Sequence, residues 1–227
     1  MTTQTRMVEV RARILKENDV LARQLRERFQ QAAVCVISFV SSPGSGKTTF
    51  LEKLMTRMAP RHRIAALVGD LATENDAARL GRACRQVRQI TTGTVCHLDA
   101  RMVSSALEGW KLEELDFLFI ENVGNLVCPS SYDLGEQMRV VLLSATEGED
   151  KPLKYPTIFN TSDVALITKI DMAEAAEFDR EAAHRAILSV RPGMRVFEVS
   201  AKTGAGMQET EELFESVREP AGADSRP

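Results

Sequence analysis

One octapeptide in the first quarter of the chain has the residue types and spacing of a phosphate-binding loop. It starts at Ser41 and reads SSPGSGKT, which fits the pattern G-x-x-x-x-G-K-S/T except that serine replaces the first glycine. Gly44 and Gly46 allow the backbone to curl so that successive N–H groups face phosphate oxygens. Lys47 would then reach the β- and γ-phosphates, and the Thr48 hydroxyl would bind Mg²⁺.

The surroundings of this loop decide between a nucleotide site and an ordinary glycine/serine turn with an exposed lysine. The apolar run AVCVISFV precedes the loop, and the helical segment TFLEKLMTRM follows it. A phosphate loop requires this order, because the positive end of the following helix faces the anion. The residues expected to contact the nucleotide here are Ser42, Gly44, Ser45, Gly46, Lys47, Thr48 and Thr49.

Two later loops carry residues suited to guanine. TKID, which ends at Asp171, resembles the guanine-recognition motif N-K-x-D of GTPases, with threonine in place of asparagine. The Asp171 carboxylate would accept hydrogen bonds from the guanine ring N–H and exocyclic amine, a donor pair that adenine lacks. SAKTG resembles the second base-contacting loop, in which the Ala201 N–H meets the guanine carbonyl. Ordinary strand-end polar residues are the alternative. The expected base-contacting residues are Thr168, Lys169, Asp171, Ser200, Ala201 and Lys202.

Acidic residues at two other strand ends are candidates for holding Mg²⁺. Asp70 follows RIAALVG, and Glu121 lies at the end of the run DFLFIEN. Either carboxylate would hold the ion directly or through water, or would instead cap a helix or anchor a loop. Gly124, in ENVG, resembles the glycine of the GTPase D-x-x-G switch, whose N–H senses the γ-phosphate. The residues expected to serve phosphoryl transfer are Lys47, Thr48, Asp70 and Gly124.

A second group of residues suits a transition metal. Cys96 and His97 are adjacent in TVCHLDA, and Cys128 ends the segment that follows Gly124. Thiolates and imidazole suit zinc, nickel(II) or copper(I). Three ligands do not close a tetrahedral or square-planar shell, so water or a second subunit would complete it. The alternative is a small core cysteine beside a capped imidazole.

These residues need a scaffold that brings strand ends together. Four further short apolar runs follow the first one, and each is followed by the polar residues described above or by SAKTG. They are RIAALVG, DFLFIEN, DVALITK and MRVFEVS. Five buried strands alternating with helices predict an α/β fold of the P-loop NTPase type, a doubly wound, mainly parallel sheet with helices on both faces. Apolar periodicity over residues 14–29 predicts an exposed amphipathic helix before this domain.

Bulk composition excludes several classes of function. The chain has 227 residues, 44% of them hydrophobic and 27% charged, with a net charge of −3. This balance gives no reason to expect nucleic acid or an anionic membrane as partner, and no apolar run approaches the ~18 residues that cross a bilayer. Four cysteines are too few for a disulfide scaffold, and a cytoplasmic location is expected. We expect a helical lead-in over 1–32, a GTPase domain over 33–218 and a flexible tail over 219–227.

Six strings, taken in order, resemble the HypB family of GTPases, which assist nickel insertion into nickel–iron hydrogenase and sometimes urease. They are VSSPGSGKTT, GDLATENDAARL, TTGTVCHLDARMV, FIENVGNLVCP, TEGEDKPLKYPTIF and VSAKTGAGM. The resemblance covers about residues 14–215, and CHLDA with ENVGNLVCP is its most specific part. UreG, the urease counterpart, resembles the chain in its GTPase parts but uses a Cys-Pro-His motif that is absent here.

The resemblance implies GTP/GDP and Mg²⁺ as cofactors, low intrinsic GTP hydrolysis and a homodimer that depends on nucleotide. It also implies a nickel or zinc site shared between subunits through Cys96, His97 and Cys128, and, as partners, a hydrogenase-maturation accessory protein and the hydrogenase large subunit. Lys151 and Lys154 match a loop that reaches the nucleotide across the dimer. A solvated basic loop is the alternative for these lysines.

Two departures from the family pattern stand out. Many HypB proteins carry an N-terminal cysteine motif or a histidine-rich stretch for nickel, whereas residues 1–34 here contain neither Cys nor His. Such a capacity is therefore missing or supplied by a partner. In addition, GDLAT stands where the family usually has GDQQT.

The resulting hypothesis joins the two sites. GTP and Mg²⁺ close a homodimer, and Gly124, held by the γ-phosphate, couples through Leu126 and Val127 to Cys128. The first alternative is a non-catalytic metal-binding adaptor that uses nucleotide only to dimerise. The second is a small P-loop kinase, which would need a phosphate-acceptor pocket and a lid that the sequence does not reveal.

Overall fold

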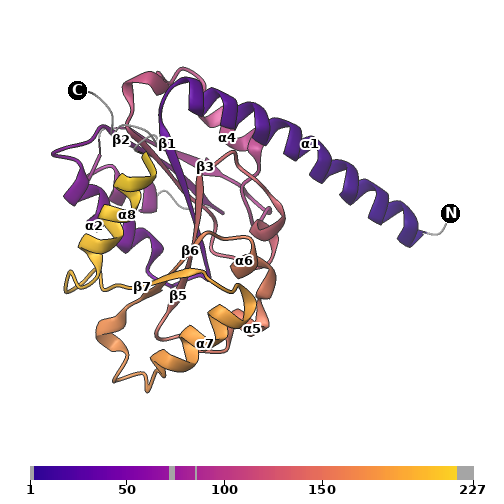
Figure 1. Cartoon of the computed structure of the whole chain (residues 1–227). Coiled ribbons are helices and arrows are strands. Elements are labelled where there is room, and N and C mark those ends of the chain that lie inside the picture. The colour runs from indigo at the N-terminus through magenta and orange to yellow at the C-terminus, as the bar shows by residue number, and fades with distance from the viewer. Residues whose placement is uncertain (1–2, 72–74, 85, 219–227) are drawn as a thin grey trace, which may run out of the picture.

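The central strand of the sheet follows directly from its sequence. β1 (Cys35–Ser41) is mostly apolar, and all seven of its residues are buried, as expected for a parallel strand covered on both faces. This computed structural model of the chain describes residues 3–71, 75–84 and 86–218. The element arrangement is drawn in Figure 1.

Parallel neighbours extend the sheet on both sides of β1. The other strands are β2 (Ile64–Asp70), β3 (Gln86–Thr91), β4 (Phe117–Glu121), β5 (Met138–Ser144), β6 (Val164–Thr168) and β7 (Arg195–Glu198). Across the described residues they form one sheet in the order β3-β2-β4-β1-β5-β6-β7, and every pair is parallel. The predicted doubly wound parallel sheet is therefore confirmed. β1 is flanked by β4 and β5, so the loop after β1 lies where the strand order reverses, the usual ligand crevice of such sheets.

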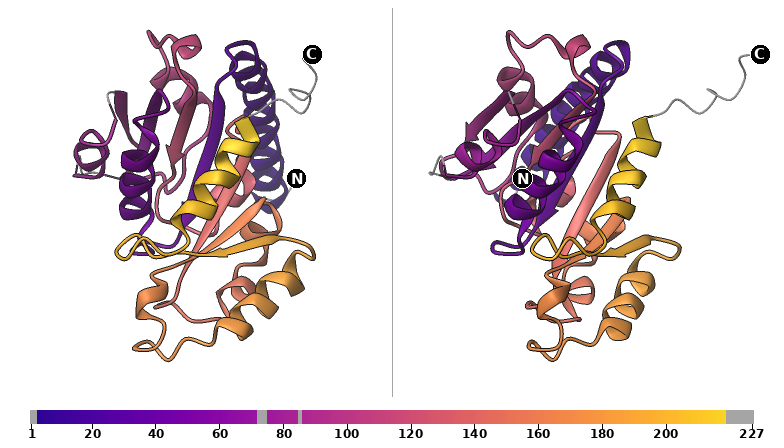
Figure 2. Two further views of the ribbon diagram at one scale, coloured as in Figure 1. Left: turned by 60° about the vertical axis from the view of Figure 1, so that its left-hand side comes forward. Right: turned by 90° about the vertical axis from the view of Figure 1, so that its left-hand side faces the viewer.

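Helices cover both faces of this sheet, as the alternation of β1 side chains requires. Ile37 and Phe39 face one layer, and Val36 and Val40 face the other. The first layer contains α2 (Lys47–Met58), α3 (Asn75–Leu80) and α8 (Met207–Arg218). The second contains α1 (Thr3–Gln31), α4 (Ala100–Ala106), α6 (Pro156–Asn160) and α7 (Arg180–Val190). The short α5 (Lys151–Lys154) precedes α6, and the two layers can be followed in Figure 2.

The N-terminal helix is better packed than the sequence predicts. α1 spans Thr3–Gln31, which is longer than the periodic segment 14–29 and lies within the expected helical lead-in over 1–32. Ala22, Leu25 and Phe29 are almost fully buried against α4 and the sheet, so the prediction of an exposed helix is wrong for its C-terminal half. Figure 1 shows the N-terminal half projecting beyond the body of the molecule.

The predicted set of five buried strands is incomplete. β3 and β5 were not predicted. The strand–helix alternation fails before β5, because only a 3-10 turn, Cys128–Ser131, lies within the segment between β4 and β5. β7 is an edge strand with an exposed or half-buried face, not a buried one. Cys84 follows the turn after α3. The predicted tail, 219–227, and part of GDLAT lie outside the described residues.

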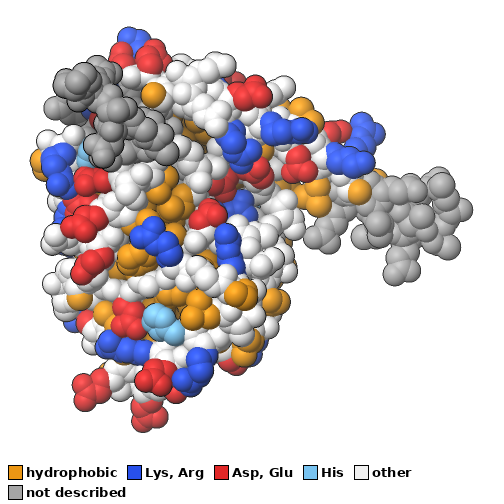
Figure 3. Space-filling view, in the orientation of Figure 1, with side chains coloured by type: hydrophobic (Ala, Val, Ile, Leu, Met, Phe, Trp, Pro, Cys, Tyr) orange, Lys and Arg blue, Asp and Glu red, His pale blue; other side chains and the backbone are white. Residues whose placement is uncertain are grey.

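The surface carries both signs of charge. On the face drawn in Figure 3, acidic and basic side chains are interspersed. No helix in the described part of the chain is both long and apolar enough to pass through a lipid bilayer.

Candidate functional site

The phosphate loop and α2 form a cradle at the carboxyl end of β1. Gly44 and Gly46 have φ of +75° and +90°, in the left-handed region that favours glycine, and α2 begins directly afterwards at Lys47. The loop borders a cavity of about 540 Å³ that is also lined by the end of β2, by α3 and by the segment after β4. Ser45 Oγ is buried without a hydrogen-bond partner among the described residues. Ser42 is a buried residue of the loop and does not line the cavity.

Lys47, Thr48 and Glu121 meet at the floor of this cradle. The Thr48 hydroxyl donates to Glu121 Oε1 at 2.6 Å, and Lys47 Nζ lies 3.5 Å from the same oxygen. Burial raises the pKa of Glu121, and the positive charge of Lys47 opposes that rise. Glu121 Oε2 is buried and has no partner among the described residues. A hydroxyl and a carboxylate oxygen with a free site form the hard oxygen donor set that suits Mg²⁺.

The rim of the cavity contains both predicted and unpredicted residues. Asp70 lines it at the end of β2, as predicted. Thr49, predicted to contact nucleotide, also lines the cavity and accepts a hydrogen bond from Arg79 Nη2 at 3.0 Å. Arg79 and Asp76 of α3 also line the cavity, and sequence reasoning missed both. Their signal was present, because they are charged residues in the string GDLATENDAARL, which ends beside the loop.

The predicted guanine loop after β6 is tied directly to the phosphate loop. The Thr168 hydroxyl is buried and donates to the Ser45 carbonyl at 2.6 Å. Lys169 adopts φ of +55°, and its Nζ donates to the Gly44 carbonyl at 2.7 Å. The Lys169 stem passes over Gly46, where an added Cβ would lie 3.5 Å from Lys169 Cε. Thr168 thus positions the loop, and Lys169 covers it.

The loop after β7 orients the predicted guanine acceptor. The buried Ser200 hydroxyl donates to Asp171 Oδ1 at 2.6 Å and also accepts the Thr203 N–H at 3.1 Å. This fixes the carboxylate of Asp171 at the carboxyl end of β6. Ala201 and Lys202 lie in the turn that follows Ser200, and Lys202 is exposed. The structure therefore brings the two predicted base loops together.

Gly124 lies against the phosphate loop. A Cβ added to it would come within 2.9 Å of Pro43 Cα and 3.0 Å of Pro43 N, both backbone atoms. Only glycine permits this approach without displacing the loop. Gly124 and its neighbour Val123 also line the cavity. The segment after β4 is thus in contact with the loop at a point four residues before Cys128.

The predicted metal ligands converge in space. Ligand atoms of Cys96, His97 and Cys128 all lie within 4.8 Å of one another. The Cys96 Sγ is 2.9 Å from the Cys128 Sγ, and all three side chains are half-buried. His97 Nδ1 is buried without a partner among the described residues, and burial lowers the pKa of this imidazole. Two thiols and a neutral imidazole with an open nitrogen are a soft donor set for nickel(II) or zinc.

Side chains that sequence reasoning missed hold these ligands together. The Asn122 Oδ1 accepts the Leu98 N–H at 3.0 Å, and Asn125 Nδ2 donates to the Cys96 carbonyl at 3.2 Å. The His97 ring stacks on Tyr132, with centroids 3.9 Å apart. Each contact joins residues 24 or more positions apart, so no local sequence pattern predicts it. Both asparagines connect the segment after β4 to the loop between β3 and α4, which bears Cys96.

The predicted cross-dimer lysines lie apart from the phosphate cavity. Lys154 Nζ is 2.5 Å from Asp150 Oδ2, and Lys151 Nζ lies 5.4 Å from the Tyr155 ring centroid. Neither lysine lines the cavity at the phosphate loop. Within one chain they form a local basic turn.

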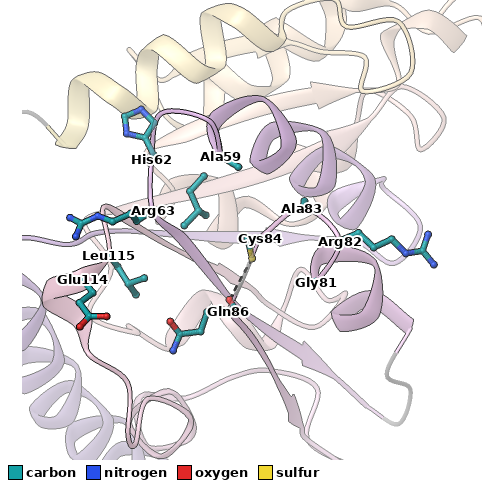
Figure 4. A pocket seen from close by; sticks show the side chains of 11 residues that line it. Ala59, His62, Arg63, Gly81, Arg82, Ala83, Cys84, Gln86, Glu114 and Leu115 are labelled. Atoms are coloured by element: carbon teal, nitrogen blue, oxygen red, sulfur yellow. Dashed lines mark hydrogen bonds between the residues drawn. The ribbon is translucent and has the colours of Figure 1, made fainter.

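A larger hollow lies at the opposite end of the sheet. It measures about 660 Å³ and is bordered by the first residues of β2 and β3 and by the turn after α3. In Figure 4 the side chains of Arg63 and Arg82 point away from it on opposite sides, while Cys84 faces Gln86. The Cys84 Sγ contacts the Gln86 carbonyl at 3.5 Å, and burial raises the pKa of the thiol to about 11. This hollow contains none of the predicted site residues.

Known proteins resemble this chain over most of its length. Residues 35–198 match the family described as CobW/HypB/UreG, nucleotide-binding domain. A hydrogenase maturation factor HypB of Azotobacter chroococcum is 47% identical over 91% of this chain and 68% of its own length. A hydrogenase/urease maturation factor HypB of Helicobacter pylori is 42% identical over 93% of this chain and 89% of its own.

Solved structures also resemble this chain. The crystal structure of HypB from Helicobacter pylori in complex with nickel superimposes with a TM-score of 0.84 at 41% identity, covering 93% of this chain and all of that one. FlhF complexed with GMPPNP and Mg²⁺ matches with a TM-score of 0.56 at 16% identity, over 86% of this chain and 83% of that one, which supports the fold alone.

Proposed function

The chain belongs to the CobW/HypB/UreG family and, within it, to the HypB proteins, and from that premise we propose that it is a GTP-hydrolysing nickel carrier for hydrogenase maturation. Urease maturation is the second use, because relatives of comparable identity are named for both enzymes. The proposal comprises a nucleotide site, a metal site and a coupling between them.

Two buried polar atoms support the nucleotide site. Ser45 Oγ and Glu121 Oε2 are enclosed at the phosphate loop and have no partner among the described residues, an arrangement that costs free energy unless a ligand satisfies them. Phosphate oxygens accept from the Ser45 hydroxyl and the loop N–H groups. Mg²⁺, held by Thr48 and Glu121 with Asp70 near, neutralises phosphate charge when bound.

Guanine specificity follows from the orientation of one carboxylate. Because Ser200 holds Asp171 Oδ1, the carboxylate is fixed before any base arrives. A base that offers adjacent N–H donors satisfies it, whereas adenine leaves it facing no donor. Lys169, already stretched over Gly46, lies where its stem covers a bound nucleotide.

Phosphoryl transfer would rely on position and charge. Lys47 would contact the terminal phosphates, Gly124 would donate its N–H to the γ-phosphate, and Arg79 adds positive charge at the rim. No general base is required of the chain, because the transition state of phosphoryl transfer is stabilised mainly by such charges.

The observation that carries the proposal is the short path between the two sites. Gly124 contacts the phosphate loop, and Asn125 bonds the Cys96 carbonyl. Cys128, three residues later, contacts Cys96. Leu126 is buried and Asn125 Oδ1 accepts the Val127 N–H at 2.8 Å, so the proposed path runs through Asn125, Leu126 and the Val127 backbone to Cys128. A γ-phosphate that pulls Gly124 would therefore change the geometry around the two sulfurs directly.

The remaining ligands are proposed to come from a second copy of the chain. Cys96, His97 and Cys128 do not close a four-coordinate nickel(II) shell, and a two-fold axis through the site would bring ligands of a second copy to the same metal. Lys151 and Lys154 would then reach the partner's nucleotide. Delivery would proceed to a hydrogenase-maturation accessory protein and the hydrogenase large subunit. Thiolate ligands work only where they stay reduced, as in the cytoplasm.

GTP turnover separates this proposal from the adaptor. The purified chain with Mg²⁺ is expected to bind GTP and release phosphate, and Lys47→Ala is expected to abolish release. Lys53→Ala, on the exposed side of α2, is the matched control and keeps wild-type turnover. Guanine-nucleotide binding without any phosphate release would favour the non-catalytic adaptor, and absence of guanine-nucleotide binding would contradict both.

A further inference from the structure

One polar side chain of α1 is buried between the two segments that carry the metal ligands. Asn18 is 5% exposed, although its neighbours on the helix are exposed or apolar. Its Oδ1 accepts the Ala100 N–H at 2.9 Å, and its Nδ2 donates to the Asp133 carbonyl at 2.9 Å. Ala100 begins α4, three residues after His97, and Asp133 lies five residues after Cys128. A single amide therefore spans both segments.

Neighbouring residues connect the hydrogen bonds of Asn18 to the metal-ligand side chains. Tyr132, which precedes Asp133, stacks on the ring of His97. Asp99 caps α4 by accepting the Met102 N–H at 2.7 Å, which fixes the turn between His97 and Ala100. Displacing either segment from Asn18 would thus slide Tyr132 along the imidazole and alter the separation of Cys96 and Cys128.

Further contacts fix α1 against the second segment. Arg26 Nη2 pairs with both carboxylate oxygens of Asp133, at 2.7 and 2.8 Å. Gly135 is pressed so closely against the helix that an added Cβ would lie 2.8 Å from the Ala22 carbonyl oxygen. The segment after Cys128 is therefore held by α1 at more than one point, and Asn18 also hydrogen-bonds the segment after His97.

We infer that Asn18 is a positioning residue for the nickel site, setting the distance between the segments that bear Cys96–His97 and Cys128. The inference rests on the proposed function, because it assumes that these side chains bind nickel. Both polar atoms of Asn18 are used, so no shorter or apolar side chain reproduces the bridge. Hydrogen bonds that fix the segments around metal ligands orient those ligands and set metal affinity.

Nickel titration of the full chain tests the inference. Asn18→Ala is expected to weaken Ni²⁺ binding about 10-fold and to change the thiolate-to-nickel charge-transfer absorption at saturation, with GDP affinity unchanged. Arg28→Ala is the matched control: Arg28 ties α1 to the Leu107 carbonyl at 3.4 Å, at the far end of α4. Its loss disturbs helix docking without touching either metal-bearing segment, so wild-type nickel affinity and spectrum are expected.

A second variant keeps the test decisive if Asn18→Ala fails to fold. Asn18→Asp has the same shape and still accepts the Ala100 N–H, but it places a carboxylate oxygen against the Asp133 carbonyl. It should also weaken nickel binding and shift the charge-transfer band. Wild-type affinity and spectrum in a folded Asn18 variant, even one of lowered melting temperature, would overturn the inference alone.

Nickel titration of Cys128→Ser and of the wild type distinguishes a failure of the proposed function from a failure of the inference about Asn18. If the wild type binds Ni²⁺ no more tightly than Cys128→Ser, the proposed nickel site is refuted, and the role of Asn18 with it. If the wild type binds through Cys128 while the Asn18 variants are unaffected, the proposed function stands and the positioning role does not.

Discussion

The two ends of the sheet are built on different principles. At the carboxyl end, Ser45, Glu121 and His97 each keep a buried polar atom that has no partner among the described residues. At the amino end, Asp116 accepts from the Arg63 backbone and guanidinium and from Arg218. The first arrangement costs stability until a ligand arrives, whereas the second contributes stability by itself.

The contrast teaches where ligands belong in this fold. The larger hollow lies at the amino end, yet its charged border residue Arg63 is already paired with Asp116. At the smaller cavity beside the phosphate loop, Ser45 Oγ has no partner among the described residues, and the same holds for Glu121 Oε2, in the carboxylate that accepts from Thr48. Unsatisfied polar atoms are thus a better guide to the site than cavity size. Variants at the carboxyl end should change ligand binding, and variants at the amino end should change stability only.

The largest effect is expected at the thiol pair. Cys128→Ser should weaken nickel binding by more than the roughly 100-fold that losing a supporting residue costs, because it removes a ligand itself. Cys84→Ser, at the amino-end hollow, is the matched control and should leave nickel affinity unchanged. Isothermal titration with Ni²⁺ measures both. Equal nickel affinities in the two variants would contradict the proposed difference between the carboxyl and amino ends of the sheet.

The next largest effect is expected at Asp171, the residue proposed to bind guanine. Asp171→Asn should weaken GTP binding about 100-fold, since charge-assisted hydrogen bonds worth roughly 3 kcal/mol are lost. The same variant should gain affinity for xanthosine triphosphate, whose carbonyl accepts from the new amide. Asp179→Asn is the control, because asparagine caps α7 as well as aspartate does. Wild-type GTP affinity in Asp171→Asn would show that this carboxylate does not read the base.

A smaller effect is expected at Thr168, which connects the loop after β6 to the phosphate loop. Thr168→Val removes the hydroxyl that donates to the Ser45 carbonyl and keeps the side-chain shape. An unmade buried hydrogen bond should reduce GDP affinity about 10-fold. Thr161→Val, which loses a hydroxyl contact to the Thr157 carbonyl at an exposed helix end, should bind GDP as the wild type does. A fluorescent-GDP titration compares the two, and equal affinities would deny Thr168 its positioning role.

The smallest effect tests the amino end. Hydrogen bonds from Arg63 hold the pKa of Asp116 at about 2, so this carboxylate stabilises the fold above its unfolded pKa of about 3.9. Asp116→Asn should lower the free energy of unfolding at neutral pH by about 1 kcal/mol. The difference should vanish as the pH falls from ~4 towards 2, because the wild type then loses the same charge. Urea unfolding at several pH values measures it, and altered nickel or GTP affinity in this variant would contradict the separation of the two ends.

Local patterns sufficed for part of this molecule. A buried strand, two glycines and a lysine specify the phosphate loop, and Asp70, Glu121 and Asp171 lie at or just after strand ends, where the sequence predicts them. β3 was missed because QVRQIT is a polar edge strand, and β5 because no helix precedes it. Such elements are decided by their neighbours in the sheet rather than by their own residues.

Contacts between distant segments could not be predicted from the sequence. Cys96 and Cys128 are chemically suggestive, but their 2.9 Å approach depends on packing across 32 residues. Asn122, Asn125 and Asn18 were overlooked, because a polar amide carries no periodic signal and its partners are backbone atoms far along the chain. Their roles become visible only when hydrogen-bond partners are accounted for one by one.

The central claim is that the γ-phosphate at Gly124 changes the metal site at Cys128, and nickel affinity measured with bound GDP and with a non-hydrolysable GTP analogue tests it most directly. The account predicts that the two affinities differ by about 5-fold or more, the lower range of measured couplings between sites. Gly124→Ala, whose Cβ would collide with Pro43, should erase the difference. Equal nickel affinities in the two nucleotide states of the wild type would contradict the account, because a ligand without differential affinity shifts no equilibrium.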